Sequence, residues 1–407
     1  MASVEPLEFN PFLPETRADP YPQYRRLREL DPVHPSFPGV WILTRYRDVA
    51  AVLRDPVTFS SDSRNSDLYQ AFRQANQDES LSLIEGQTGR TMLFSDPPDH
   101  TRLRTLVSKA FTARAIEAMR PHIKEITDRL LEPLRDEGRF DVVADHAYPL
   151  PVTVICEMLG IPPDDRHLFH TWSQDLVLVL DPMVTVETLD RVAQALVSFR
   201  QYFDALVSER RANPTEDLLS ALITAEEEGR RLTGDELRST CILLLVAGHE
   251  TTVNLISNGM LALLRRPDQL DRLGREPGLI RNAIEELLRY DSPVQLTGRT
   301  VMRDLEIEGK PIRRGEQVVG VVGAANRDPE QFSDPELLDV TRRDIRHLSF
   351  SAGIHYCLGA PLARVEGQIA IGEVVRRFPR LQLVTEALEW RETVTLRGLR
   401  SLPVAVG

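Results

Sequence analysis

The order of apolar and polar positions along the chain predicts a mostly helical protein with a small β region. Helical periodicity dominates from Arg102 to Arg289, where apolar residues recur about every three to four positions. Runs rich in β-branched residues and bounded by turn residues predict the strands, which we place near Val301–Glu308, Gln317–Val322 and Leu381–Val384. The first part of the chain predicts a helix over Tyr24–Leu30, a hairpin around Trp41–Thr44 and a helix over Val49–Leu53.

One predicted helix is much longer than the others. Thr233 and Glu236 form a capping box, and no proline follows until Pro267, which allows about 32 residues, or roughly 48 Å, of helix. Polar residues interrupt its apolar run at the centre, from Ala247 to Thr252. Polar groups in a buried helix are costly unless they have partners, so the interruption argues against a membrane span and indicates a functional site.

Composition and charge exclude several classes of protein. The chain has 407 residues, 42% of them hydrophobic and 27% charged, and neither linker nor repeat divides it, so we expect one domain over residues 1–407. Its net charge of −12 is spread along the sequence, which argues against a nucleic-acid partner. The first 14 residues lack a basic segment followed by an apolar one. We therefore expect a monomeric cytoplasmic protein without a membrane anchor.

Three cysteines are too few and too widely spaced for a disulfide framework. Cys156 and Cys241 lie in apolar runs and are expected to be buried structural residues. Cys357 differs, because it lies between Gly353 and Gly359 directly before a predicted helix. The free amides at a helix N-terminus favour a thiolate, which is the form that binds metals.

The segment from Phe350 to Gly359 resembles the haem-ligand loop of cytochromes P450, in which Phe, Gly, a basic residue, Cys and Gly recur at these intervals. Ser351 departs from the pattern, since the family more often has Gly there. The resemblance implies the mainly α, single-domain P450 fold with a minor β region. It also implies haem b between the long helix and the cysteine loop, with Cys357 as the iron ligand and Phe350 and Gly359 beside the cofactor.

Two further motifs extend the resemblance. Glu286 and Arg289 match the family's Glu-x-x-Arg pair, and Arg342 matches its third member, which implies a structural role. The interruption of the long helix resembles the oxygen-activation motif, which implies that Ala247 and Gly248 lie against the haem, that Thr251 bonds dioxygen and that Glu250 supplies protons. The alternative for a mid-helix threonine is a hydrogen bond to the carbonyl four residues back.

The family register also assigns contacts with haem and substrate. His100, Arg104, Arg299 and His355 are expected to bind the haem propionates. The expected walls of the substrate pocket are mostly apolar and comprise Leu243, Val246, Ala247, Val294, Leu296, Thr395 and Leu396. The long segment between Phe59 and Thr91 is expected to be a mobile lid.

The resemblance implies a haem-thiolate monooxygenase of secondary metabolism that uses O₂ to hydroxylate or epoxidise an apolar small molecule. A fatty acid, terpenoid, steroid or polyketide such as a macrolide would each suit these walls. The sequence has no flavin or dinucleotide motif, so electrons are expected from a ferredoxin with its reductase. The basic residues that are candidates for its docking patch are Arg102, Lys109, Arg343, Arg346 and Arg364. A haem-thiolate sensor and a haem-free helical scaffold are the alternative functions.

Overall fold

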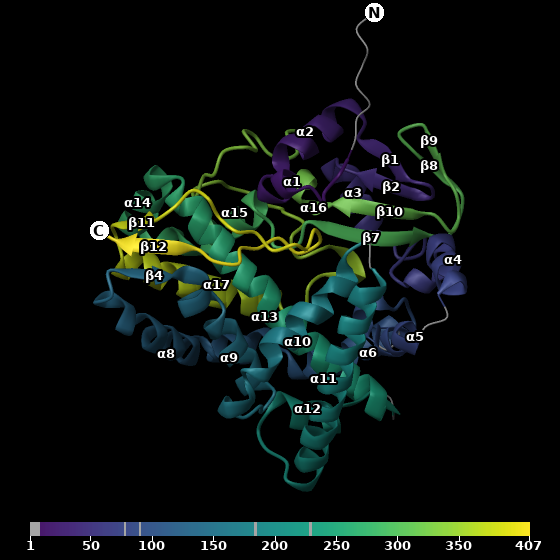
Figure 1. Ribbon diagram of the computed structural model, residues 1–407, viewed down its shortest axis with the longest axis horizontal. Coiled ribbons are helices and arrows are strands. Elements are labelled where there is room, and N and C mark those ends of the chain that lie inside the picture. The colour runs from purple at the N-terminus through teal and green to yellow at the C-terminus, as the bar shows by residue number, and fades with distance from the viewer. Residues whose placement is uncertain (1–8, 77–78, 89–90, 183–184, 228–229) are drawn as a thin grey trace, which may run out of the picture.

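The computed structural model describes residues 9–407 except 77–78, 89–90, 183–184 and 228–229, and it is mainly helical (Figure 1). The α-helices are α1 Pro14–Ala18, α2 Tyr21–Leu30, α3 Tyr46–Arg54, α4 Asp67–Ala75, α5 Glu79–Thr88, α6 Asp99–Ala110, α7 Ala113–Ala118, α8 Arg120–Leu131, α9 Pro149–Met158, α10 Leu168–Leu176, α11 Val186–Ala212, α12 Leu218–Thr224, α13 Gly234–Leu264, α14 Pro267–Arg275, α15 Ile280–Tyr290, α16 Val322–Ala325 and α17 Ala360–Arg377. The helices expected over Tyr24–Leu30 and Val49–Leu53 are α2 and α3.

The strands form two small sheets and two hairpins. A five-stranded sheet has the order β1-β2-β10-β7-β3, and a three-stranded sheet has the order β11-β12-β4. The strands are β1 Val33–Phe37, β2 Val40–Leu43, β3 Phe59–Ser60, β4 Arg139–Asp141, β5 Glu226–Glu227, β6 Arg230–Arg231, β7 Leu296–Val301, β8 Leu305–Ile307, β9 Lys310–Ile312, β10 Gln317–Val321, β11 Leu381–Leu383 and β12 Pro403–Val406. The expected hairpin is β1–β2, and the three expected strand regions are all present. The β content is minor, as predicted.

The long helix predicted from the capping box is α13, and both hydrogen bonds of the Thr233–Glu236 box are present. Among the described residues, α13 is the one helix long and apolar enough to cross a membrane, but 78% of its apolar window is buried inside the protein. Figure 1 shows α13 among α9, α10, α15 and α17. The helix is apolar because its side chains pack against these neighbouring helices.

Glycines allow α13 to pack closely against its neighbours. A Cβ on Gly259 would lie 3.0 Å from Ile371 of α17 and 3.2 Å from Leu287 of α15. A Cβ on Gly367 of α17 would lie 3.1 Å from Leu255. These distances are shorter than ordinary van der Waals contact, so α13, α15 and α17 form one tightly packed group. That group carries the Glu-x-x-Arg pair, the polar interruption and the helix after Cys357.

The segment expected to be a mobile lid is substantially helical, because it includes α4 and α5. Leu81 and Ile84 of α5 are 5% and 4% exposed and join a cluster with Leu189, Val192 and Leu196 of α11. The expectation missed these two helices because both are short, and the apolar periodicity of α5 is weak. Residues 77–78 and 89–90 of this segment lie outside the described part of the chain.

Candidate functional site

Cys357 lies where the loop after residue 350 turns into α17. Its backbone N–H donates to the Phe350 carbonyl at 2.8 Å, and the 3-10 turn Gly353–His355 shapes the loop between them. Gly353 has φ +65°, and a Cβ there would lie 2.5 Å from the Leu53 carbonyl oxygen, so only glycine fits. Ser351 also has a positive φ, 61°. This left-handed backbone gives the physical reason why glycine suits that position.

The surroundings of the Cys357 thiol act on it in opposite directions. Burial raises the pKa of the thiol above its usual range, whereas the backbone N–H groups of Gly359 and Ala360 and the charge of Arg104 lower it. The helix N-terminus therefore favours the thiolate, as expected from the sequence, but does not outweigh burial. A positive metal ion at the sulfur would supply the missing stabilisation. The two other cysteines are fully buried, and burial raises the pKa of each thiol to about 12.

Four basic side chains that the sequence assigned to propionates converge beside this loop. His100 and Arg104 come from α6, Arg299 from β7 and His355 from the cysteine loop. The rings of His100 and His355 are 4.4 Å apart. Burial, followed by the charges of Arg299, His100 and Arg104, lowers the pKa of His355 to about 3. Burial likewise lowers the pKa of Arg299 to about 10, with Asp96 acting in the opposite direction.

This basic cluster is short of negative charge. Both ring nitrogens of His100 are buried without a hydrogen-bond partner among the described residues. Asp96 is the carboxylate that acts on His100 and Arg299, and it is held by the Ser60 hydroxyl and the Ser61 N–H. Sequence reasoning did not single out these three residues. A pair of carboxylates from a bound group would satisfy the cluster, so the residues present fit a haem.

A row of residues on one face of α13 is left uncovered. Leu243 and Thr251 are partly exposed and Ala247 is exposed, although most of the helix around them is buried. They are spaced four residues apart, so they lie on one face. Gly248 has a packing reason as well, because its Cβ would lie 3.3 Å from Ile155 of α9. Its contact with a cofactor remains a prediction.

The two adjacent threonines of α13 have different surroundings. Both hydroxyls donate to the carbonyl four residues back, Thr251 to Ala247 at 2.9 Å and Thr252 to Gly248 at 3.1 Å. The alternative noted for mid-helix threonine is therefore present at both positions. Thr251 is partly exposed on the open row, whereas Thr252 is 2% exposed. Only Thr251 is therefore placed to meet a ligand on that face, and its hydroxyl oxygen retains acceptor capacity.

Glu250 is 1% exposed and has two basic neighbours. Arg391, from the C-terminal segment, donates to one carboxylate oxygen, and His249 Nε2 lies 3.4 Å from the other. Burial would raise the pKa of Glu250, but His249 and Arg391 outweigh it and hold the pKa at about 2. Sequence reasoning missed Arg391, which lies 141 positions away and carries no local signal.

Glu366 of α17 is a second buried carboxyl group close to this helix. It is 1% exposed, and neither oxygen has a hydrogen-bond partner among the described residues. Burial raises its pKa to about 8, while the Thr252 hydroxyl acts in the opposite direction. It was also missed, although its position in the apolar stripe of Leu362, Val365 and Ile369 was a signal.

The Glu-x-x-Arg pair is buried and joins its predicted third member. Glu286 and Arg289 are 0% exposed and form a bidentate pair with distances of 2.7 and 2.8 Å. Arg342 Nε lies 3.1 Å from both oxygens of Glu286. Arg289 also donates to the carbonyls of Asn326, Pro335 and Leu337. Because Asn326 in turn bonds Leu348 and Ser349, the network holds the chain that leads into the cysteine loop.

The expected substrate walls come together from distant parts of the sequence. Val294 forms a bridge with Leu396, and the Gln295 N–H donates to the Thr395 carbonyl at 2.8 Å. Beyond the α13 row, Val294 retains exposed surface. The other expected residues, Val246, Leu296, Thr395 and Leu396, are 5% to 9% exposed. Leu296 packs in the sheet core with Tyr21 and Val40, and its contact with a substrate remains a prediction.

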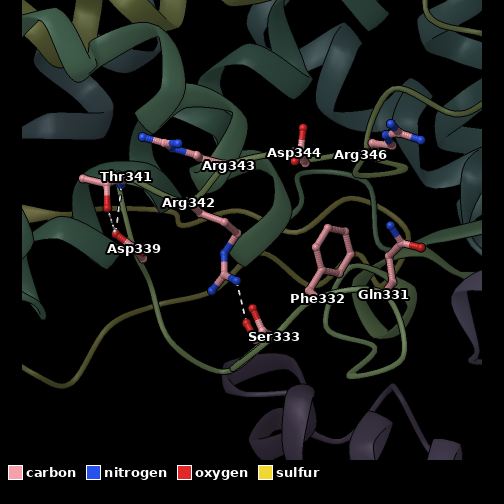
Figure 2. A pocket seen from close by; sticks show the side chains of 9 residues that line it. All are labelled: Gln331, Phe332, Ser333, Asp339, Thr341, Arg342, Arg343, Asp344 and Arg346. Atoms are coloured by element: carbon pink, nitrogen blue, oxygen red, sulfur yellow. Dashed lines mark hydrogen bonds between the residues drawn. The ribbon is translucent and has the colours of Figure 1, made fainter.

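The five basic residues considered for electron-donor docking are not equivalent. Arg102 pairs with Glu236, and Arg364 forms a bidentate pair with Glu285 at 2.7 and 2.8 Å, so neither contributes a free positive charge. Arg343 and Arg346 are exposed and line an open, polar surface pocket (Figure 2). Figure 2 also shows Arg342 reaching to Ser333 below them. The patch is therefore narrower than the sequence suggested.

Comparisons with known proteins identify the family of this chain. The family model described as Cytochrome P450 matches residues 40–386. The polyketide biosynthesis cytochrome P450 PksS of Bacillus subtilis (strain 168) is 40% identical over 99% of this chain and 100% of its own length. Its solved structure has a TM-score of 0.89, with 98% and 100% of the two chains covered and 39% identity.

Two further relatives are similarly close. The 6-deoxyerythronolide B hydroxylase of Saccharopolyspora erythraea is 41% identical over 99% of both chains. The structure of P450BioI in complex with an acyl carrier protein ligated to hexadec-9Z-enoic acid has a TM-score of 0.89 at 39% identity, covering 97% of this chain and 99% of that one. With the family model spanning residues 40–386 and relatives about 40% identical over nearly the whole chain, the protein belongs to the cytochrome P450 family and is a haem-thiolate monooxygenase.

Proposed function

We propose that the protein oxygenates an apolar polyketide-type or fatty-acyl substrate at a haem b held without a covalent link to the porphyrin. The observation that carries the proposal is the open row of Leu243, Ala247 and Thr251 on an otherwise buried helix. It offers two apolar side chains and one hydroxyl to a ligand. We propose further that residues 1–407 form one domain and that the protein is a cytoplasmic monomer.

The residues assigned to the cofactor each have a defined task. Cys357 provides the iron ligand, and Phe350 and Gly359 flank it in the loop. His100, Arg104, Arg299 and His355 would bind the two propionates, and Ala247 and Gly248 would contact the haem from α13. The bound haem supplies the redox chemistry that activates dioxygen. Glu286, Arg289 and Arg342 hold the loop in place and take no part in the chemistry.

Glu250 and Thr251 of α13 serve proton delivery to the site. The Thr251 hydroxyl accepts or donates a hydrogen bond on the open face of α13. Glu250 supplies the proton that is transferred to that face. Because Glu250 is ionised and bound to Arg391, it must gain a proton before it can deliver one. A buried carboxylate with two basic neighbours suits this proton transfer, because the neighbours fix its position before the reaction.

Names of relatives support the proposed substrate class. One similar protein is named for polyketide biosynthesis, one is a hydroxylase of 6-deoxyerythronolide B, and one was solved with a fatty acid on an acyl carrier protein. The apolar row on α13 and the nearby Val294 suit such chains through hydrophobic contact. Steroids and terpenoids are the competing classes, and a vitamin D(3) 25-hydroxylase is also among the relatives, at 42% identity.

A binding screen tests the substrate class directly. Macrolactones, free fatty acids, acyl groups on a carrier protein, steroids and terpenoids would each be titrated into the ferric holoenzyme. We expect a high-spin shift of the haem spectrum with a macrolactone or acyl ligand, at micromolar concentration. Leu243→Phe should weaken that response about tenfold by filling the open row. A response to steroids or terpenoids alone would contradict the proposed class.

Electrons are proposed to come from an acidic ferredoxin that docks over Arg343 and Arg346. Reversing both charges (Arg343→Glu with Arg346→Glu) should slow haem reduction about tenfold at low salt and remove most of its salt dependence, because steering by exposed charge is screened by ions. Reduction rates measured by stopped flow between low and high salt provide the test. Reversal of Arg102, which Glu236 already neutralises, is the matched control. An unchanged rate in the double variant would argue against this docking site.

A further inference from the structure

His249 is a buried histidine in the centre of the polar interruption of α13. It is 0% exposed, and its Nδ1 lies 2.7 Å from the Leu245 carbonyl oxygen. A carbonyl oxygen can only accept a hydrogen bond, so Nδ1 carries the hydrogen. The ring nitrogen that can gain or lose a proton is therefore Nε2.

The Nε2 atom of His249 faces a carboxylate oxygen of Glu250. It lies 3.4 Å from Glu250 Oε1, and neither atom has a hydrogen-bond partner among the described residues. The other oxygen of Glu250 accepts from Arg391. Two lone pairs facing each other in a buried site are unfavourable, whereas one proton between them makes a charge-assisted hydrogen bond. The geometry therefore suits a proton shared by His249 and Glu250.

A short series of polar side chains leads from His249 toward the surface. The Tyr148 ring makes edge contacts with His249, at a centroid distance of 6.2 Å, and with His170, at 4.6 Å. The Tyr148 hydroxyl oxygen is buried without a hydrogen-bond partner in the described part of the chain. His170 is exposed. Burial lowers the pKa of His170, and Glu250, Arg391 and His249 act on it as well, so these groups share one electrostatic environment.

We infer that His249 is a positioning and proton-relay residue, which reloads Glu250 with protons that reach it from the His170 side. The inference rests on the proposed role of Glu250 in proton delivery. Monooxygenation converts a substrate C–H into C–OH and releases one water, consuming O₂, two electrons and two protons. In the relay step the Nε2–H bond breaks and an Oε1–H bond forms, leaving a neutral imidazole and a carboxylic acid. A solvent proton then restores Nε2–H.

The decisive variant is His249→Gln, whose side-chain amide can still donate a hydrogen bond but cannot release a proton at neutral pH. In the holoenzyme we expect normal haem content and substrate binding, product formation slowed about tenfold or more, and a larger solvent deuterium isotope effect. His146→Gln, at a buried histidine bonded to Ala370, is the matched control.

A double-variant cycle separates failure of the relay from failure of the proposed role of Glu250. If His249 acts through Glu250, adding His249→Gln to Glu250→Gln causes no further loss. Full activity of His249→Gln beside an impaired Glu250→Gln would overturn the relay alone. Full activity of Glu250→Gln would overturn the proposed role of the carboxylate, and the relay with it. Nitrogen NMR of the ¹⁵N-histidine-labelled, diamagnetic ferrous carbon monoxide complex provides a readout independent of turnover. Protonation of His249 at Nδ1 is expected, and a ring protonated only at Nε2 overturns the inference.

Discussion

Cys357→Ser is expected to abolish the thiolate-type absorption band of the reduced carbon monoxide complex and to reduce monooxygenase activity below detection. The reason is that a serine hydroxyl does not provide the anionic sulfur ligand on which the band and O–O cleavage depend. The Phe350–Cys357 backbone hydrogen bond and the Gly353 turn do not involve the sulfur, so the loop should keep its conformation. The spectrum of the dithionite-reduced, carbon monoxide-treated protein is the measurement.

The other two cysteines provide matched controls. Cys156 and Cys241 are both 0% exposed and pack in the main hydrophobic cluster. Cys156→Ala and Cys241→Ala should lower thermal stability by about 1 kcal/mol each, through lost packing, and leave the band unchanged. Loss of the band in either control, with retention in Cys357→Ser, would mean that the ligand has been assigned to the wrong residue.

Thr251→Ala should divert most reducing equivalents from product to hydrogen peroxide, while leaving the fold, haem content and substrate affinity nearly unchanged. The hydroxyl is partly exposed on the open row of α13, and its internal bond to Ala247 is one that an alanine helix does not need. Stability should therefore change by less than about 1 kcal/mol. Product and peroxide formed per electron consumed are the quantities to measure.

Thr252→Ala is the natural comparison, because the two threonines are adjacent and make the same type of backbone hydrogen bond. Thr252 is buried beside Glu366, so its loss should affect stability more than coupling. Thr251→Ser, which keeps the hydroxyl, should restore most of the coupling. If Thr252→Ala were the uncoupled variant and Thr251→Ala the normal one, the alcohol would belong to the other position.

The sequence by itself determined the features that depend on local order. The capping box, the absence of proline and the apolar periodicity were enough to place α13 to within about one residue at its N-terminus. Three sets of residues identified the family: the residues around Cys357, the Glu-x-x-Arg pair and the four basic residues. Their order and spacing can be read from the sequence without knowledge of the packing. The comparisons confirmed that family and its reaction class.

Only the tertiary structure decided which charges are available and which side chains remain open. Arg102 and Arg364 looked like Arg343 and Arg346 in the sequence, but Glu236 and Glu285 neutralise the first two through contacts between distant segments. The motif already favoured Thr251 over Thr252, but only packing shows that Thr252 is buried while Thr251 stays partly exposed. Arg391 reaches Glu250 across 141 positions, and Glu366 is isolated by burial in α17. Ion pairing and burial depend on which atoms meet in space, and side-chain periodicity along one element does not contain that information.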